Sequence, residues 1–465
     1  MTTPIDSRIF RAYDIRGLAY EQITEHVSRA IGRAFGTELR LLYEKDHPTV
    51  CVGRDARTHG PAFQLAAIEG LIEAGCHVFD IGQTPTPLNY YTICTMGFDG
   101  GLQVSASHNP KEDNGFKLSL RNAAGFFGEK IQDLRKRIER QDVLTGEGRL
   151  ETLDAITPYV AHLSSQFAGV GEGLNIVVDS GNGVAGPIYC DVLRRVGATL
   201  SELYTEPDGT FPNHHADPSQ KSTLKMLQAT VQDVGAHAGI AFDGDGDRMG
   251  LVDEKGVIRT ADELLLLLAK DHLSRHPGAL VVFTVSNSGI LKTEVEAMGG
   301  KPVMGRVGRS FVAQKMREVG AQIGGEVSGH MFFGEDYFGF DDALVAALRL
   351  LSILKQSSAP VSSLLADFPK VFQSQEMRPK VPDERKSEII REVTNHFLQS
   401  HEVHTLDGAR IEFGDGAWAA IRQSNTSPRL SICIEARSPE ALYALEKQIR
   451  GHMEKYPEIE WDSAH

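Results

Sequence analysis

The residues best suited to chemistry are three aspartates at alternating positions, Asp243, Asp245 and Asp247, in the segment DGDGDR (243–248). Three carboxylates held close together repel one another, and a divalent cation is the natural reason for a protein to accept that arrangement. The glycines between them let the backbone curl so that all three reach one ion. Three protein ligands leave positions open on an octahedral ion, which suits Mg²⁺ bound together with a phosphate oxygen. The alternative is a solvated acidic turn.

The same segment has part of the spacing of a calcium-binding EF-hand loop, with Glu254 at the twelfth position. Arg248 stands at the sixth position, where that loop needs glycine, and the strand-like run AGIAF precedes the segment in place of a helix. We therefore reject calcium.

A second loop, SASHNP (105–110), places Ser107 beside His108 after the strand-like run GGLQV. Such a pair could be a phosphorylatable nucleophile and its partner. Serine-rich turns before Asn-Pro are, however, usually only turns. No serine stands in a G-x-S-x-G elbow, so an α/β-hydrolase is not supported.

Two later loops carry groups suited to sugars and phosphates. GEVSGH (325–330) offers a carboxylate, a hydroxyl and an imidazole, which suit a ligand with adjacent hydroxyls. RQSNTSP (422–428) offers a guanidinium, several hydroxyls and backbone N–H groups, which suit phosphate. Each could be a polar turn by itself, but together with a metal site they indicate a phosphorylated sugar.

One motif favours a different class of protein. GNGVAG (181–186) follows the apolar run LNIVVD and is a formal G-x-G-x-x-G, with Glu202 and Glu206 about twenty residues further on. An NAD-dependent oxidoreductase is therefore a rival hypothesis. It ranks second because it gives the aspartates and the Ser-His loop no purpose.

Three stretches of the chain repeat the elements that would position these loops. Each has a β-branched apolar run, a polar loop, an amphipathic helix closed by glycine and a second apolar run; they begin at TVCVGRD (49–55), LNIVVDSGNG (174–183) and ALVVFTVSNSG (279–289). This order is typical of β-α-β units with mostly parallel strands. We expect three similar α/β domains with mixed sheets in series.

The C-terminal part has a different order of elements. After Ala366, a proline-punctuated passage, DFPKVFQSQEMRPKVPDERK (367–386), is interpreted as a linker. A helix, the strand-like runs RIEF, AWAAIRQ and LSICIEA, and a final helix from Pro439 to about Tyr456 follow, which predicts a smaller α+β domain. The predicted boundaries are 1–152, 153–256, 257–368 and 369–465.

Composition excludes several function classes. The chain has 465 residues and a net charge of −14, so long-range electrostatics would repel nucleic acid and anionic lipid. The basic run at residues 135–137 adjoins an apolar helical stripe (Ile131, Leu134, Ile138) and is read as a solvated helix face.

Five scattered cysteines indicate neither a disulfide framework nor a structural zinc site. No signal peptide or membrane span is evident, so a cytoplasmic protein is expected. The sequence leaves its oligomeric state unknown.

The motifs SASHNP, DGDGDR, GEVSGH and RQSNTSP, together with FRAYDIRG (10–17) and FPNHH (211–215), resemble those of the α-D-phosphohexomutase superfamily in order and spacing. The resemblance is strongest to its bacterial phosphomannomutase/phosphoglucomutase branch and covers essentially the whole chain. It implies three related α/β domains and a smaller α+β domain around a central cleft.

The resemblance also implies roles for individual residues. Ser107 would be the phosphoserine, and Asp243, Asp245 and Asp247 would hold Mg²⁺ with its phosphate. The charged catalytic groups would be Arg16, His108, Lys117 and Arg248, with Lys117 a candidate general base. The substrate-binding groups would be Tyr13, Arg309, Glu326, Ser328 and His330 for the sugar, and Arg422, Ser424, Asn425 and Thr426 for its nonreacting phosphate.

The implied reaction interconverts hexose 6-phosphate and hexose 1-phosphate of mannose or glucose through a hexose 1,6-bisphosphate, which also serves as activator. Phosphoglucosamine mutase is the alternative within the class, and a non-catalytic sugar-phosphate-binding protein is one outside it. Arg309 stands where many members of this branch carry His and phosphoglucosamine mutases tend to carry Asp, and the loop around Ser286 lacks a lysine found in some members. If Arg309 faces the sugar, its fixed charge should disfavour the amine of glucosamine phosphate.

Overall fold

The computed structural model describes residues 5–424 and 427–461. The backbone divides into two compact units, each made of two chain segments. The first unit comprises Met1–Leu264 and Ser328–Leu364, and the second comprises Leu265–Val327 and Leu365–His465. Each unit is described by itself below.

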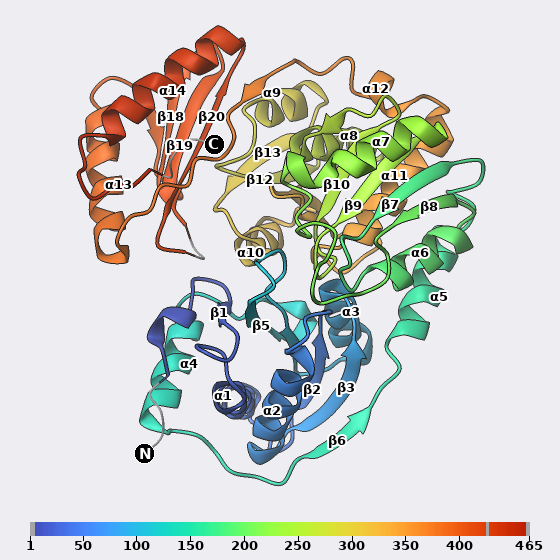
Figure 1. Cartoon of the computed structure of the whole chain (residues 1–465), viewed down its shortest axis with the longest axis vertical. Coiled ribbons are helices and arrows are strands. Elements are labelled where there is room, and N and C mark those ends of the chain that lie inside the picture. The colour runs from blue at the N-terminus through green and yellow to red at the C-terminus, as the bar shows by residue number, and fades with distance from the viewer. Residues whose placement is uncertain (1–4, 425–426, 462–465) are drawn as a thin grey trace. The chain divides into compact units, whose positions relative to one another are not determined.

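The first unit contains a six-stranded mixed sheet near its N-terminus (Figure 1). Its order is β1 (Ile15–Leu18), β5 (Asp113–Leu120), β4 (Gly100–Val104), β2 (Thr49–Arg54), β3 (His77–Gln83) and β6 (Arg149–Thr152). Its helices are α1 (Glu25–Tyr43), α2 (Gly60–Glu73), α3 (Thr86–Met96) and α4 (Glu129–Arg140). Strand β2 pairs in parallel with both β3 and β4, so the loops after β2 and β4 leave the same edge of the sheet.

A second sheet in the same unit has the order β11 (Ile258–Arg259), β10 (Met249–Asp253), β9 (Ala238–Phe242), β7 (Asn175–Asp179) and β8 (Thr199–Leu203). Its helices are α5 (Ile156–Gln166), α6 (Gly186–Arg195) and α7 (Lys225–Val234). All five residues of β9 are buried, and this strand pairs with β7 on one side and β10 on the other. The unit also contains β15 (Met331–Phe333), α11 (Ala343–Ser357) and α12 (Val361–Leu364).

In the second unit, β12 (Leu280–Thr284) pairs in parallel with β13 (Lys301–Gly305) and β14 (Ile323–Gly325). Helices α9 (Ile290–Ala297) and α10 (Arg309–Val319) belong to this unit, and α8 (Ala261–Arg275) begins in the first unit and continues into the second. Strands β2 and β3, β7 and β8, and β12 and β13 are each a parallel pair joined through a helix. The three predicted β-α-β repeats are therefore confirmed.

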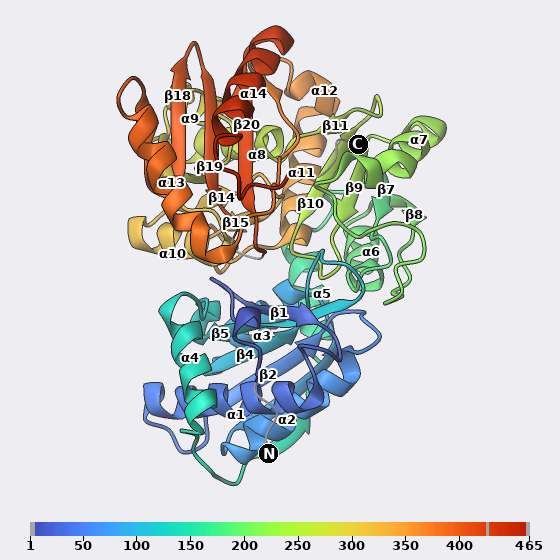
Figure 2. The ribbon, with the colours of Figure 1, turned by 60° about the vertical axis from the view of Figure 1, so that its left-hand side comes forward.

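The C-terminal sheet has the order β16 (Phe372–Gln373), β20 (Leu430–Ala436), β19 (Ala417–Gln423), β18 (Ala409–Gly414) and β17 (Glu402–His404). Helices α13 (Asp383–Phe397) and α14 (Pro439–Met453) pack on it (Figure 2). Strands and helices together bury one apolar cluster. Helix α14 begins with an N-cap at Ser438, whose side chain accepts from the N–H of Ala441, and has Pro439 as its first residue.

Two details of the predicted C-terminal part are wrong. The proline-punctuated passage is not a linker over its whole length: β16 pairs with β20, Met377 exchanges backbone hydrogen bonds with Ile432, and α13 begins inside the passage at Asp383. The prolines are tolerated because this segment forms the edge of the sheet. The last helix ends at Met453 and not near Tyr456. Tyr456 precedes Pro457, and a residue before proline disfavours the helical conformation.

The basic run on α4 is a solvated face only in part, because Arg137 is largely covered and pairs with Glu38 of α1 at 2.7 Å. Ile131 and Leu134 are buried, while Arg135 pairs with Glu139 and Lys136 with Asp133. Among the residues that the structure describes, no helix has the length and apolar character required to cross a membrane.

A buried carboxylate fixes the start of α11. Asp342 Oδ1 accepts hydrogen bonds from the N–H groups of Leu344 (2.9 Å) and Val345 (3.2 Å). Its Oδ2 accepts from the hydroxyls of Tyr159 (2.9 Å) and Tyr337 (2.7 Å). Burial raises the pKa of Asp342 to about 6, although these hydrogen bonds oppose the shift.

This raised pKa predicts a pH-dependent loss of stability. A carboxyl whose pKa is higher in the folded state stabilises the fold at low pH, and the contribution is lost as pH rises through about 6. The shift from 3.8 corresponds to about 3 kcal/mol. Asp342→Asn cannot ionise at this position and so escapes the loss that wild type undergoes. The free energy of unfolding of the variant minus that of wild type should therefore rise by roughly that amount between pH 4 and pH 7. A difference between the two proteins that does not change with pH would contradict the assignment.

Candidate active site

Ser107 and Asp243 meet where two loops of the first unit come together. Ser107 follows β4 and Asp243 follows β9, and the Ser107 hydroxyl donates to Asp243 Oδ2 at 2.7 Å. Both residues are buried. A Cβ at Gly244 would come within 2.6 Å of the Ser107 carbonyl oxygen, so only glycine allows the loops this close.

The three aspartates converge as predicted. One carboxylate oxygen from each lies within 4.8 Å of the others, and all three side chains are fully buried. The Oδ1 atoms of Asp245 and Asp247 have no hydrogen-bond partner among the described residues. Buried oxygens without donors, in a set made only of carboxylates, fit a hard divalent cation. Glu254 instead accepts hydrogen bonds from Ser362, in agreement with the rejection of calcium.

Lys117, on β5, is a direct partner of this cluster. Its Nζ donates to Asp245 Oδ2 and to Asp247 Oδ2, each at 2.5 Å, and its side chain is 1% exposed. Burial raises the pKa of Asp243 well above its ordinary value, and the charges of Asp247 and Asp245 add to the effect. Burial also opposes ionisation of Asp245, but the adjacent Lys117 ammonium lowers the pKa of that carboxyl overall. Asp243 and Asp245 therefore differ in how readily they ionise.

Arg248 and His330 form a hydrogen-bonded pair beside the carboxylates. Arg248 Nε donates to His330 Nε2 at 3.0 Å and lies 3.9 Å from Asp243 Oδ2. His330 Nδ1 lies 2.7 Å from Asp341 Oδ2. The chain before His330 is held to β10, because the N–H of Met249 donates to the carbonyl of Gly329 at 3.1 Å. Ser328, also predicted at this site, is half-buried in the same segment.

Arg16, on β1, supports the serine loop. Its Nη1 donates to the Ala106 carbonyl (3.1 Å) and to Asn109 Oδ1 (2.8 Å), while Asp14 pairs with the same guanidinium at 2.7 Å. His108 Nδ1 lies 3.4 Å from Ser107 Oγ.

Burial, together with nearby positive charges, keeps His108 neutral. Burial, followed by the positive charges of Arg248 and Arg16, lowers the pKa of His108 well below its ordinary value. Tyr13 is half-buried near Arg16 and Arg248 and helps to raise the pKa of both guanidinium groups, against the opposing effect of their burial.

The structure adds residues that sequence reasoning missed. Thr86 Oγ1 and Ser105 Oγ donate to Asp245 Oδ2 at 2.5 and 3.1 Å. Ser105 Oγ also accepts from the N–H of Ser107 at 2.8 Å. Arg57, which follows β2, donates to the Ser107 carbonyl at 2.8 Å. A signal was present for Arg57, since the loops after the parallel strands β2 and β4 must leave the same sheet edge.

The glycine-rich loop at residues 181–186 does not present a dinucleotide site. The N–H groups of Gly181, Asn182, Gly183 and Val184 already donate within the chain, to Asp179, Tyr204, Ser180 and Gly244 respectively. A Cβ at Gly183 would also come within 2.9 Å of the Gly244 carbonyl oxygen. Gly183 therefore allows the aspartate loop, and not a pyrophosphate, to lie close to this backbone. This argues against the oxidoreductase hypothesis.

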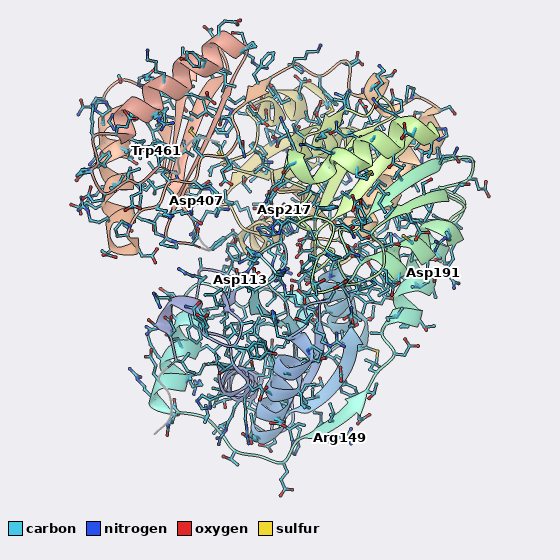
Figure 3. All side chains as sticks on the ribbon, viewed as in Figure 1. Asp113, Arg149, Asp191, Asp217, Asp407 and Trp461 are labelled. Atoms are coloured by element: carbon cyan, nitrogen blue, oxygen red, sulfur yellow. The ribbon has the colours of Figure 1, made fainter. Side chains whose placement is uncertain are left out.

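In the second unit, Arg309 is buried at the start of α10. It follows Gly308, whose N–H donates to Glu326 Oε1 at 2.7 Å. The preceding turn is fixed by Asp407 (labelled in Figure 3), which accepts from the N–H of Val307 at 2.9 Å. The structure thus brings the loops of Arg309 and Glu326 together.

The RQSNTSP segment of the same unit is surrounded by cations. Arg422 Nε donates to Ser286 Oγ at 3.2 Å, which joins this segment to the loop after β12. Arg378 donates to Ser424 Oγ (3.2 Å) and Ser427 Oγ (3.4 Å). Lys386 Nζ donates to the carbonyls of the same two serines, each at 3.2 Å. Asn425 and Thr426, which were also predicted to bind phosphate, lie outside the described residues.

Comparisons with protein-family models cover most of the chain. Three models described as phosphoglucomutase/phosphomannomutase alpha/beta/alpha domains I, II and III match residues 7–144, 157–256 and 260–372. The model of the phosphoglucomutase/phosphomannomutase C-terminal domain matches residues 376–452. The fold class predicted from the sequence, three α/β domains followed by a C-terminal α+β domain, is confirmed.

Individual relatives agree with the family models. A phosphomannomutase/phosphoglucomutase of Pseudomonas aeruginosa is 40% identical over 451 residues, covering 97% of this chain and 96% of the relative. A phosphoglucomutase of Neisseria gonorrhoeae is 35% identical over 458 residues, covering 97% and 98%. The crystal structure of a family protein from Burkholderia thailandensis has a TM-score of 0.88 and 39% identity, covering 96% of this chain and 97% of that one. This chain belongs to the phosphoglucomutase/phosphomannomutase family of the α-D-phosphohexomutase superfamily and is an isomerase of the phosphohexomutase class.

Proposed function

We propose that this phosphohexomutase interconverts the 6-phosphate and 1-phosphate of mannose or glucose through a phosphorylated Ser107 and a hexose 1,6-bisphosphate. The observation that carries the proposal is the 2.7 Å hydrogen bond between Ser107 Oγ and Asp243, one of three buried carboxylates suited to a cation. A phosphate on that oxygen would have its charge next to the cation. Carbons 1 and 6 of a hexose are too far apart for a phosphate to move directly between them.

Asp243, Asp245 and Asp247 would hold the cation, for which we propose Mg²⁺. Bound there, Mg²⁺ would supply positive charge to the phosphate on Ser107. Lys117 and Arg248 contribute further positive charge from the same cluster. Arg16 orients the serine loop through Ala106 and Asn109.

The proposed reaction has two matched half-reactions. In the first, the bond between Ser107 Oγ and phosphorus breaks, and a bond forms between phosphorus and the free hydroxyl oxygen of the sugar. We propose Lys117 as the group that moves both protons. Its ammonium, which donates to Asp245 and Asp247, would give a proton to Ser107 Oγ as that oxygen leaves, and the resulting amine would act as the base that takes the proton of the sugar hydroxyl. The bisphosphate then returns its other phosphate to Ser107 by the reverse step, which frees the isomeric product and restores the phosphoserine.

The remaining predicted residues fit substrate recognition. We propose that Tyr13, Arg309, Glu326, Ser328 and His330 contact the sugar. We propose that Arg422 and Ser424, with Asn425 and Thr426, bind the nonreacting phosphate. Lys386 and Arg378 place positive charge beside Ser424 and Ser427, which supports a phosphate-binding role for this segment.

A coupled assay tests this function and its alternatives together. Mannose 1-phosphate, glucose 1-phosphate and glucosamine 6-phosphate would be compared with and without EDTA, each with a hexose 1,6-bisphosphate as activator. We expect turnover of the first two substrates and loss of activity with EDTA. Preference for glucosamine 6-phosphate would make the chain a phosphoglucosamine mutase. Binding without turnover would make it a non-catalytic sugar-phosphate-binding protein.

Arg309→His is expected to change sugar preference without affecting phosphorylation of Ser107. A guanidinium donates only, whereas a neutral imidazole can also accept a hydrogen bond from a hydroxyl. Loss of one charge-assisted hydrogen bond to one of the sugars would raise its transition-state free energy by about 1.5–3 kcal/mol. The kcat/KM for that sugar would fall relative to the others by the corresponding factor. The measurement is kcat/KM for mannose, glucose and glucosamine phosphates in both proteins. Unchanged ratios would show that Arg309 does not contact the sugar.

A further inference from the structure

Arg57 is a buried arginine whose hydrogen bonds are concentrated on the serine loop. Its guanidinium donates to four backbone carbonyls of that loop and the start of the next strand: those of Ser107 (2.8 Å), Asn109 (2.7 Å), Pro110 (2.5 Å) and Asp113 (2.8 Å; labelled in Figure 3). Its side chain is fully buried, and Nε pairs with Asp55 Oδ2 at 3.1 Å. The rigid fork of donors is what allows one side chain to hold four oxygens.

Ser107 needs such support because its backbone is in the left-handed region, with φ of 53°. A residue with a Cβ adopts that region only at an energetic cost, and such strain persists where the surroundings fix it. Both sides of the residue are fixed here. The Ser107 N–H donates to Ser105 Oγ at 2.8 Å, and the Ser107 carbonyl accepts from Arg57.

The space around Arg57 leaves it little freedom to move. A Cβ at Gly209 would come within 2.2 Å of the Ala56 carbonyl oxygen, so the loop of Gly209 lies directly against the chain beside Arg57. The ring of Phe211 lies 5.5 Å from the Arg57 guanidinium carbon. The guanidinium is thus enclosed between this loop and the serine loop. Lysine, with one ammonium, could not reach all four carbonyls.

We propose that Arg57 and Ser105 are positioning residues that hold Ser107 in its left-handed conformation, so that its Oγ faces Asp243 and can accept and donate phosphate. This inference rests on the proposed phosphoserine mechanism. Arg57 acts only through the backbone of the loop, and Ser105 acts through the Ser107 N–H and through Asp245. Changes at Arg57 or Ser105 should therefore affect the rate of phosphate transfer much more than the affinity for substrate.

The experiment measures how fast hexose 1,6-bisphosphate phosphorylates Ser107, by intact mass after rapid quench, together with kcat and KM. The variants are Arg57→Lys, Arg57→Ala, Ser105→Ala and Ser105→Thr. Arg54→Lys is the matched control, because Arg54 ends the same strand but donates to Gln83 and the Asp55 carbonyl. Circular dichroism and melting temperature check that each variant is folded.

We expect Arg57→Lys to slow phosphorylation and kcat by about a hundredfold, with KM changed less than about threefold, since small misplacements of reacting groups cost roughly that factor. Millimolar guanidinium should partly restore Arg57→Ala, and sodium chloride at equal ionic strength should not. Ser105→Ala should slow phosphorylation, and Ser105→Thr, which keeps the hydroxyl, should slow it much less. The Arg54→Lys control should match wild type.

The outcomes separate this inference from the mechanism on which it rests. If wild type is not phosphorylated on Ser107, the proposed function fails. If wild type is phosphorylated and Arg57→Lys is phosphorylated equally fast, only the positioning role is overturned. If both Arg57 variants fail to fold, the test rests on Ser105→Ala and Ser105→Thr. Equal rates of Ser107 phosphorylation in these two variants would overturn the proposal.

Discussion

Replacing Ser107 with alanine should abolish normal turnover, with kcat reduced at least about a thousandfold, as expected when a covalent nucleophile is removed. The fold should survive, because the loop keeps its backbone contacts to Arg57 and to the Ser105 hydroxyl. The variant loses the hydrogen bonds of the hydroxyl, among them those to Asp243 and His108. Wild-type protein should carry one phosphate on Ser107, and Ser107→Ala should carry none.

Intact-mass and phosphopeptide analysis of purified protein would measure this phosphate, and the coupled assay would measure turnover. Ser274→Ala is a matched control, because the Ser274 hydroxyl is exposed and donates to the Asp271 carbonyl within α8. Near-wild-type rates in Ser107→Ala would refute the assignment. A small residual activity would not, since a sugar bisphosphate can pass phosphate to a neighbouring group.

The repeated part of the fold was predictable because its pattern is local. Each β-α-β unit carries its own alternation of apolar strand, polar loop and amphipathic helix, and strands β2, β7 and β12 lie where that alternation placed them. The passage at 367–386 was misread for the opposite reason. Its prolines resemble those of a linker, whereas the pairing of Met377 with Ile432 is made across more than fifty residues. The domain boundaries predicted at 152, 256 and 368 stay predictions.

The candidate site was predictable where a motif concentrates its chemistry. The aspartates and Ser107 stand in short polar loops after buried strands, and these loops do meet. Arg57 was missed because its role depends on contacts with carbonyls about fifty residues away, which have no residue-type signature. The pairing of Lys117 with two of the aspartates could not be predicted either. It depends on β5 passing the loop after β9, which no local pattern encodes.

Asp243→Asn should have opposite effects on stability and on metal binding. Burial and the neighbouring carboxylates raise the pKa of Asp243, so its ionised form destabilises the metal-free fold, and the penalty grows as pH rises through the folded pKa. Asparagine matches the protonated form. Its oxygen can accept from the N–H groups of Asp247 and Arg248, and its amide can donate to Ser107 Oγ. In EDTA at neutral pH we therefore expect the variant to melt at a higher temperature than wild type.

Addition of Mg²⁺ should reverse that order. A ligand that binds only the folded state stabilises it by RT ln(1 + [L]/Kd), about 2.7 kcal/mol at a hundredfold excess over Kd. Wild type should gain this increment, and Asp243→Asn should gain little of it, because one charged oxygen ligand is lost. Calorimetric melting with EDTA and with Mg²⁺ measures both effects, and Asp233→Asn on the exposed face of α7 is the control. If the variant is less stable than wild type in EDTA, the carboxylates do not destabilise the metal-free fold. If its melting temperature rises with Mg²⁺ as much as that of wild type, Asp243 is not a ligand of the cation.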